Sequence, residues 1–131
     1  MWNSAAPNVF ARRYMYALPA PLDVAAMRRA AALIEGEHDF TAFCSNKRMK
    51  KSAVRNLKKI SIERRGGELR FALTGDGFLY NMVRIIVGTL LEVGMGKRPA
   101  ESVSAVLAVK NRELAGFTAP AQGLMLWEVR Y

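Results

Sequence analysis

The most regular apolar pattern in the chain covers residues 77–97, GFLYNMVRIIVGTLLEVGMGK. Apolar residues recur there at helical spacing, at Leu79, Met82, Val83, Ile86, Leu90 and Val93. Further apolar residues extend around most of the circumference, which predicts a buried helix. Asp76 and Gly77 suit its beginning, and Gly94 and Gly96 suit its end. A single narrow polar stripe breaks the apolar surface, at Asn81, Arg84, Gly88 and Glu92.

Shorter patterns on both sides of this helix predict an α+β fold. Helices are expected at 23–34, where Asp23 is the N-cap, and at 99–109, which begins at Pro99. Strands are expected at 13–18, 54–63, 69–74 and 124–131, with a hairpin turn at Gly66–Gly67. Leu57 is out of phase with Ile60 and Ile62, which predicts a bulge near Lys58. The predicted fold class is therefore an antiparallel sheet with helices packed on it.

Arg84 is the most informative residue of the polar stripe. A guanidinium keeps its charge, and burying it without a partner costs several kcal/mol, roughly the desolvation penalty of an ion. It therefore needs a carboxylate or a phosphate. Two interpretations stay open: a structural salt bridge or snorkelling arginine, and an arginine that holds a catalytic acid or a substrate phosphate. Gly88, one turn further on, leaves room for another group to approach.

The charge balance favours a polyanionic partner. The chain has 131 residues, enough for one domain with a core, and a net charge of +9. Nucleic acid is a better candidate than a membrane, since the apolar helix is too short and interrupted to predict a membrane span. Positive charge concentrates at residues 45–65, including Lys47, Arg48, Lys50, Lys51, Arg55 and Lys58. This run either contacts phosphate or is a solvated face, and its few aromatic residues favour recognition of folded RNA by backbone and shape.

Little in the sequence points to metal or thiol chemistry. Cys44 is the single cysteine, which excludes an internal disulfide and a cysteine zinc site and fits a reducing cytoplasm. It is either a small buried apolar residue or a reactive thiol. His38 is either a structural hydrogen-bonding residue or a catalytic base. Asp39 is expected to cap a short turn that brings Phe40 and Phe43 into the core. We expect no metal and no cofactor.

Several motifs together resemble one enzyme family over nearly the whole chain. They are the helix at 77–97, GEHDFTAF at 36–43, Arg112, AGFTAPAQGL at 115–124, and the closing LWEVRY. In order and spacing they are similar to the tRNA pseudouridine synthase A family. The resemblance implies the C-terminal domain of the pseudouridine synthase fold and a cytoplasmic, homodimeric isomerase without cofactor. Its substrate would be uridine in the anticodon stem-loop of tRNA, at tRNA positions 38–40.

The same resemblance assigns roles to single residues. Arg84 matches the arginine that pairs with the family's catalytic aspartate, and Leu124 matches the apolar residue that packs against uracil. We also expect Asn81, one turn before Arg84 on the same stripe, to bind substrate. Lys47, Arg48, Lys50, Lys51, Arg55 and Lys58 would form one wall of the tRNA-binding groove.

The catalytic aspartate itself has no match. In the family it belongs to a motif resembling GRTDAG, whereas the aspartates here are Asp23, Asp39 and Asp76, all in other contexts. We therefore expect residues 1–20 to connect to a missing N-terminal half and residues 21–131 to form the C-terminal domain. Alone, this chain would be inactive, and Arg84 would be unpaired within it. The alternatives are a non-catalytic RNA-binding module and a dimerisation domain.

Overall fold

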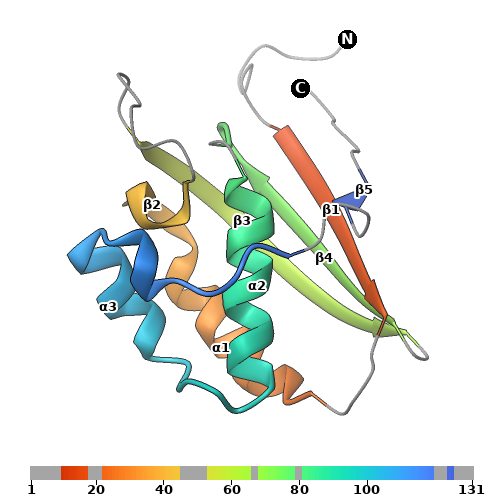
Figure 1. The fold of residues 1–131 in the computed structure, drawn as a ribbon. Helices are drawn as coiled ribbons and strands as arrows, with labels where there is room; N and C mark the ends of the chain where they lie inside the picture. The colour runs from red at the N-terminus through yellow and green to blue at the C-terminus, as the bar shows by residue number, and fades with distance from the viewer. Residues whose placement is uncertain are drawn as a thin grey trace, which may run out of the picture.

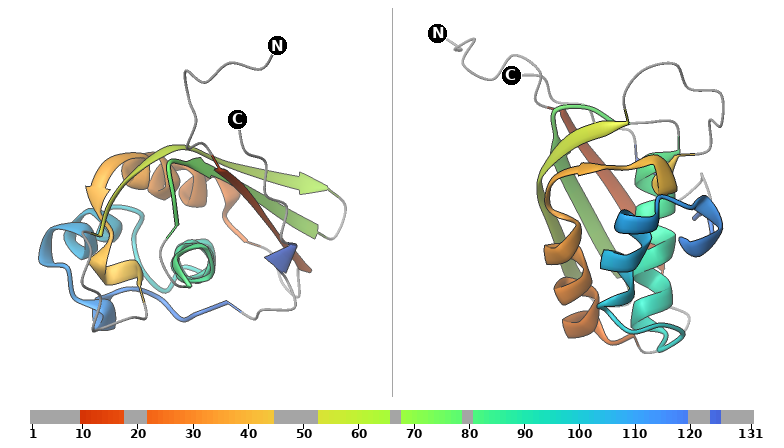
Figure 2. Two further views of the ribbon diagram at one scale, coloured as in Figure 1. Left: turned by 90° about the horizontal axis from the view of Figure 1, so that it is seen from above. Right: turned by 90° about the vertical axis from the view of Figure 1, so that its left-hand side faces the viewer.

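The computed structural model describes residues 10–17, 22–44, 53–65, 68–78, 81–119 and 124–125. Three α-helices lie on one face of a five-stranded sheet (Figures 1 and 2). The helices are α1 (Val24–Ile34), α2 (Met82–Gly94) and α3 (Ser102–Val109), and the strands are β1 (Phe10–Ala17), β2 (Gly36–Asp39), β3 (Val54–Arg65), β4 (Glu68–Gly75) and β5 (Leu124–Met125). The strand order is β2-β3-β4-β1-β5, and each neighbouring pair is antiparallel. The predicted fold class is confirmed.

The first strand begins earlier than its sequence pattern predicted. β1 pairs with β4 from Phe10 opposite Gly75 to Ala17 opposite Glu68. Part of the segment expected as a connector, residues 1–20, therefore belongs to the sheet. Tyr14 lies opposite Phe71, is 1% exposed, and meets that ring edge-on at 6.2 Å between centroids. The contact fixes the face that β1 turns toward the helices.

β3 and β4 form the long hairpin at the centre of the sheet. β4 alternates half-buried and buried residues along its length, as the sequence predicted. The pairing register shifts between Leu57 and Lys59, which confirms the bulge at Lys58. Arg65 pairs with Glu68, so two residues join the strands; the predicted turn at Gly66–Gly67 lies outside the described residues.

β2 is short, and α1 covers part of the β3 edge that β2 leaves free. The β2–β3 pairing ends with Gly36 opposite Leu57. Beyond that point the Ile60 N–H donates to Glu35 Oε2 at 2.7 Å, and Arg28 Nη2 donates to the Ile62 carbonyl at 2.8 Å. Side chains from α1 and from Glu35, the residue just after it, thus bind backbone groups that a further strand would otherwise bind.

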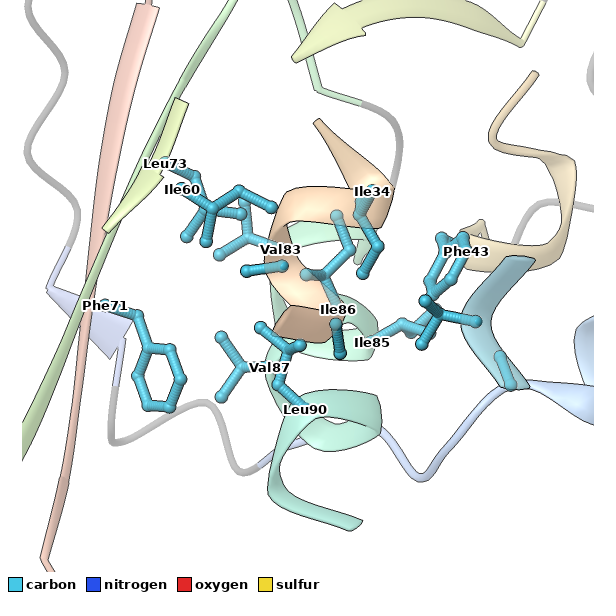
Figure 3. Close-up of a cluster of buried hydrophobic side chains, with 14 of the residues drawn as sticks. Ile34, Phe43, Ile60, Phe71, Leu73, Val83, Ile85, Ile86, Val87 and Leu90 are labelled. Atoms are coloured by element: carbon cyan, nitrogen blue, oxygen red, sulfur yellow. The ribbon is translucent and has the colours of Figure 1, made fainter. Parts of the chain in front are cut away.

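α2 is the central helix, and all of its residues except Arg84 and Glu92 are buried. Ile34 from α1, Phe43 from the 3-10 turn η1 (Thr41–Phe43), and Phe71 from β4 surround it (Figure 3). Burial on all sides agrees with the apolar pattern around its circumference.

The beginning of α2 differs from the prediction. The helix begins at Met82, preceded by Asn81 in the left-handed region at φ 59°. Asp76 is not the helix cap, because its polar groups form hydrogen bonds with the backbone of β3. The Asp76 N–H donates to the Asn56 carbonyl at 3.1 Å, and the Asn56 N–H donates to Asp76 Oδ1 at 2.9 Å. No helix in the described ranges is long and apolar enough to cross a membrane.

Candidate functional site

An extended segment crosses α2 on the side away from the sheet. This crossing segment, residues 115–119, follows the 3-10 turn η2 (Arg112–Leu114) and is drawn in blue in front of α2 in Figure 1. Seen from above, α2 lies between the sheet and this segment (Figure 2, left). The contact runs along the polar stripe predicted from the sequence, with Thr89 beside it. The residues of α2 at this contact are Arg84, Gly88, Thr89 and Glu92.

Two glycines bring the backbones of α2 and the crossing segment into contact. A Cβ added at Gly88 would lie 1.8 Å from the Phe117 carbonyl oxygen. A Cβ added at Gly116 would lie 2.6 Å from the Thr89 Cα. Both distances are far below van der Waals contact with backbone atoms, which cannot move aside as a flexible side chain can. The room that Gly88 was predicted to leave is therefore occupied by the main chain of the crossing segment.

Hydrogen bonds fix the position of the segment along the helix. The Gly116 N–H donates to Thr89 Oγ1 at 2.8 Å, and the Phe117 N–H donates to Glu92 Oε2 at 3.2 Å. Thr89 is fully buried, and its hydroxyl in turn donates to the Ile85 carbonyl at 2.8 Å. These donors and acceptors are satisfied side by side, which sets one register between helix and segment.

Two further arginines hold the chain around the crossing segment. Arg112 Nη1 donates to the Gly116 carbonyl at 2.9 Å, and its Nη2 donates to Thr118 Oγ1 at 3.0 Å. Arg98 Nη2 donates to the Leu114 carbonyl at 2.6 Å, and its Nε lies 3.4 Å from Glu92 Oε1. Glu92 therefore joins the segment to the arginine that binds the preceding turn.

Arg84 binds the last residue of the segment through both backbone and side chain. The Ala119 N–H donates to the Arg84 carbonyl at 3.0 Å, and Arg84 Nε donates to the Ala119 carbonyl at 2.6 Å. Arg84 Nη1 donates to Asn81 Oδ1 at 3.1 Å. The expectation that Arg84 is unpaired within this chain is therefore wrong, since the guanidinium has two neutral acceptors.

The charge of Arg84 is nevertheless not matched by an anion. No carboxylate in the part of the chain that the structure describes forms an ion pair with it. This arrangement disfavours the interpretation of Arg84 as a structural salt bridge. A half-buried guanidinium, held at Nε and Nη1 by neutral oxygens, is suited to bind a carboxylate or phosphate that comes from elsewhere.

The remaining predicted site residues are only partly described. Leu124 begins β5 opposite Tyr14, which places it at the edge of the sheet next to β1. Arg55 is half-buried in β3 and donates from Nη1 to the Val54 carbonyl at 2.8 Å, and Lys58 is exposed at the bulge. Lys47, Arg48, Lys50 and Lys51 lie outside the described residues. Their roles, and substrate binding by Asn81, stay predictions.

The residues considered for other chemistry occupy structural positions. His38 Nε2 lies 3.0 Å from the Glu35 carbonyl and its ring meets Phe40 edge-on, while Cys44 is 5% exposed. The N-cap of η1 is Phe40 and not Asp39 as predicted, but the Asp39 carboxyl accepts hydrogen bonds from the Thr41 N–H and hydroxyl at the start of the turn. The bond from the Thr41 hydroxyl holds the pKa of the Asp39 carboxyl below the ordinary value of 3.8. Within the described ranges, no three His, Cys, Asp or Glu side chains gather as a metal site would require.

The sequence reasoning missed Thr89 and Arg112 as parts of this site. Thr89 lies inside an apolar stretch of the sequence, which gave no sign that its hydroxyl has a specific partner. Arg112 was recognised as part of a motif, but its contacts are with a backbone carbonyl and with Thr118, which no side-chain pattern reveals.

Comparison with known proteins shows the family of the chain. The sequence model of the tRNA pseudouridine synthase family matches residues 30–131, and the chain belongs to that family. Its relatives include proteins named tRNA pseudouridine synthase A from Geobacillus sp. (strain WCH70), Halalkalibacterium halodurans and Geobacillus kaustophilus. They are 54%, 53% and 49% identical over 95%, 94% and 100% of this chain, which covers 50%, 47% and 51% of their own lengths. The chain thus spans about half the length of the curated relatives that it matches.

Proposed function

We propose that this chain is the C-terminal, active-site-supporting part of a tRNA pseudouridine synthase A. The reaction would isomerise uridine to pseudouridine in the anticodon stem-loop, at tRNA positions 38–40. The nucleophilic aspartate would come from an N-terminal half outside this sequence. The observation that carries the proposal is Arg84, a half-buried guanidinium on the central helix that forms no ion pair with the described residues.

The geometry of Arg84 suits the role of holding a carboxylate. A guanidinium has four N–H bonds on its two terminal nitrogens, and Asn81 accepts one of them. The bond from Nε to the Ala119 carbonyl fixes the plane of the group before any ligand arrives. A carboxylate bound by the terminal nitrogens would stay ionised and oriented, because an opposite charge nearby favours its charged form. An aspartate held in this way is ready to act as a nucleophile.

The rest of the proposed assembly concerns the tRNA. Leu124 would pack against uracil, and Asn81 would contribute to substrate binding as well as positioning Arg84. Lys47, Arg48, Lys50, Lys51, Arg55 and Lys58 would bind phosphates along one wall of a groove. Support comes from the net charge of +9 and from the exposure of Lys58 at the strand bulge. We further propose a cytoplasmic homodimer, as the family resemblance implies.

The proposal is tested in the intact protein that carries this chain. Unmodified tRNA is incubated with it, and pseudouridine in the anticodon stem-loop is measured under single-turnover conditions. Arg84→Lys keeps the charge but loses the planar pair of donors, and it should lower the rate roughly a hundredfold, a loss of about 3 kcal/mol of transition-state stabilisation. Arg29→Lys, an exposed position on α1, is the matched control and should behave as wild type.

Three outcomes decide between the functions considered. Turnover by the wild-type protein, lost in Arg84→Lys with tRNA affinity retained, supports the proposal. Tight tRNA binding without any turnover by the intact protein would favour the non-catalytic RNA-binding module. Pseudouridine formation by residues 1–131 alone would show that the nucleophile lies within this chain, against the assignment made here.

A further inference from the structure

We propose that Gly88, Thr89 and Glu92 are positioning residues for the isomerisation, acting through the crossing segment on Arg84. The inference rests on the proposed function. It assigns a task to residues that have none in the function proposed above, where Arg84 holds the carboxylate and Leu124 packs against uracil. The task is to set where the main chain of residues 115–119 lies against α2, and so to set the direction of the Arg84 guanidinium.

The first step of the argument is that main-chain contact defines this interface. At Gly88 the Phe117 carbonyl occupies the volume of the missing side chain, and at Gly116 the Thr89 backbone does the same. Helix and segment therefore approach to a distance that any side chain would prevent. Gly88 lies inside a helix, where glycine is less favourable than alanine, so its presence needs a compensating contact of this kind.

The second step is that the hydrogen bonds allow only one register. Thr89 accepts from Gly116 and Glu92 accepts from the next residue, Phe117. Sliding the segment by one residue would leave the buried Gly116 N–H without its acceptor, which is unfavourable because a buried donor then lacks a hydrogen bond. Thr89 and Glu92 thus fix the position of the segment along the helix, and Gly88 fixes how closely the segment approaches the helix.

The third step connects this register to the reacting end of the site. Ala119 is bound to Arg84 at both its N–H and its carbonyl. The carbonyl holds the side-chain Nε, so a displacement of the segment also turns the guanidinium. Gly88 lies one helical turn beyond Arg84, and the segment joins the two positions. A small shift at Gly88 would therefore misalign the donors that are proposed to hold the catalytic carboxylate.

The experiment compares two identical substitutions in the same helix of the intact protein. Gly88→Ala places a methyl group against the Phe117 carbonyl. Gly94→Ala places one against Met27, where the nearest atoms, Sδ at 2.5 Å and Cγ at 2.9 Å, belong to a flexible side chain. Gly88→Ala should lower the single-turnover rate at least tenfold with tRNA affinity within twofold of wild type. Gly94→Ala should keep a rate within twofold of wild type.

A second pair of variants covers the case in which Gly88→Ala does not fold. Thr89→Val keeps the shape and removes the acceptor for Gly116, whereas Thr89→Ser restores a hydroxyl. We expect Thr89→Val to lower the rate at least fivefold and to lose hydrogen-exchange protection at the Gly116 amide, and Thr89→Ser to recover most of both. A purely stabilising role predicts instead that rates measured well below the melting temperature do not change.

The outcomes separate this inference from the proposed function. An inactive wild-type protein would refute the proposed function. Hydrogen exchange alone would then test the segment geometry, and retained protection of the Gly116 amide in Thr89→Val would refute the contact between Thr89 and Gly116. An active wild type with unchanged rates in Gly88→Ala and Thr89→Val would refute the inference only. Loss of tRNA affinity in place of rate would also overturn it, since the segment would then bind substrate directly.

Discussion

At the scale of single residues, the site depends on Arg84 being held by neutral partners. A charged donor bound to a carbonyl and an amide oxygen keeps most of its charge available, whereas a donor already paired with a carboxylate would not. The two bonds to Ala119 and Asn81 therefore orient the guanidinium without neutralising it. This distinction separates a residue that completes a fold from one that awaits a ligand.

Replacing Arg84 by methionine should destabilise this chain. If Arg84 had no partner, its removal would be neutral or stabilising, because a buried charge without a partner would be lost. The Ala119 carbonyl, however, belongs to a fully buried residue and would lose its donor, at a cost of about 1–3 kcal/mol. Urea unfolding of residues 1–131 measures the difference. A midpoint at or above that of wild type would show that the bond to Ala119 contributes nothing to stability.

Thr41→Val should raise the pKa of Asp39 toward its ordinary value of 3.8. The hydrogen bond from the Thr41 hydroxyl is the main cause of the lowered pKa, with smaller help from the Thr41 N–H and from Lys110. A carboxyl with a lowered pKa stabilises the fold above pH 3.8 and loses that contribution as the pH falls through the folded-state value. The variant should therefore lose less stability between neutral and acid pH. Carbon-detected NMR titration of Asp39 checks the shift.

At the scale of elements, α1 and the residue that follows it cover part of the free edge of β3. Arg28 and Glu35 bind backbone groups of β3 where β2 no longer covers it. The free edge of a strand is a site for unwanted pairing with another chain, and side chains that bind its polar groups reduce that risk.

Arg28→Met should expose this arrangement. The change removes two donors from the Ile62 carbonyl while keeping a long apolar stem, and we expect a loss of about 1–2 kcal/mol in the free energy of unfolding. Arg29→Met, at the next position and exposed, is the control and should be close to neutral. Equal effects in the two variants would mean that the β3 edge gains nothing from Arg28.

The elements that sequence predicted well are those with a local pattern. α1, α3 and β4 follow helical or alternating spacing, although α3 begins at Ser102 and not at Pro99 as predicted. The bulge at Lys58 appears as a break in phase. β2 was missed because GEHD has no alternation and pairs only where β3 presents an edge. The beginning of α2 was placed too early because apolar residues continue ahead of Met82, while the left-handed Asn81 that precedes the helix has no local signal of its own.

The candidate site shows the same division between local and distant information. Arg84 and Gly88 were recognised because a polar stripe on an apolar helix is visible in the sequence. Their partners were not, since these are main-chain groups of a segment about thirty residues later. Side-chain patterns report which face of a helix is unusual, but they do not report which backbone will lie on it.

At the scale of the whole molecule, the described helices cover one face of the sheet and leave the other without a helix (Figure 2). Positive charge in the sequence concentrates between β2 and the end of β3. This concentration of positive charge favours the segment as the part of the chain that binds a polyanion.

Binding of tRNA by the intact protein should weaken steeply with salt, because each neutralised phosphate releases counterions. Lys50→Glu together with Lys51→Glu should reduce affinity for all tRNAs alike and flatten the salt dependence. Arg29→Glu with Lys97→Glu makes the same change in charge at exposed positions on the helical side, and it should have a smaller effect. Filter binding at several salt concentrations gives both slopes. Equal losses in the two double variants would make the basic run a solvated face.

The place of β1 in the sheet has a consequence for how the protein is made. β1 lies between β4 and β5, so both of its neighbours are translated long after it. On the ribosome, one edge of β1 has no partner from this sheet until β4 is made, and the other edge has none until β5 is made. Pairings between such distant parts of a chain form slowly. The nascent chain therefore carries an incomplete sheet from the synthesis of β1 until that of β5, and residues 10–17 are the part of this sheet that stays open longest to binding by a chaperone.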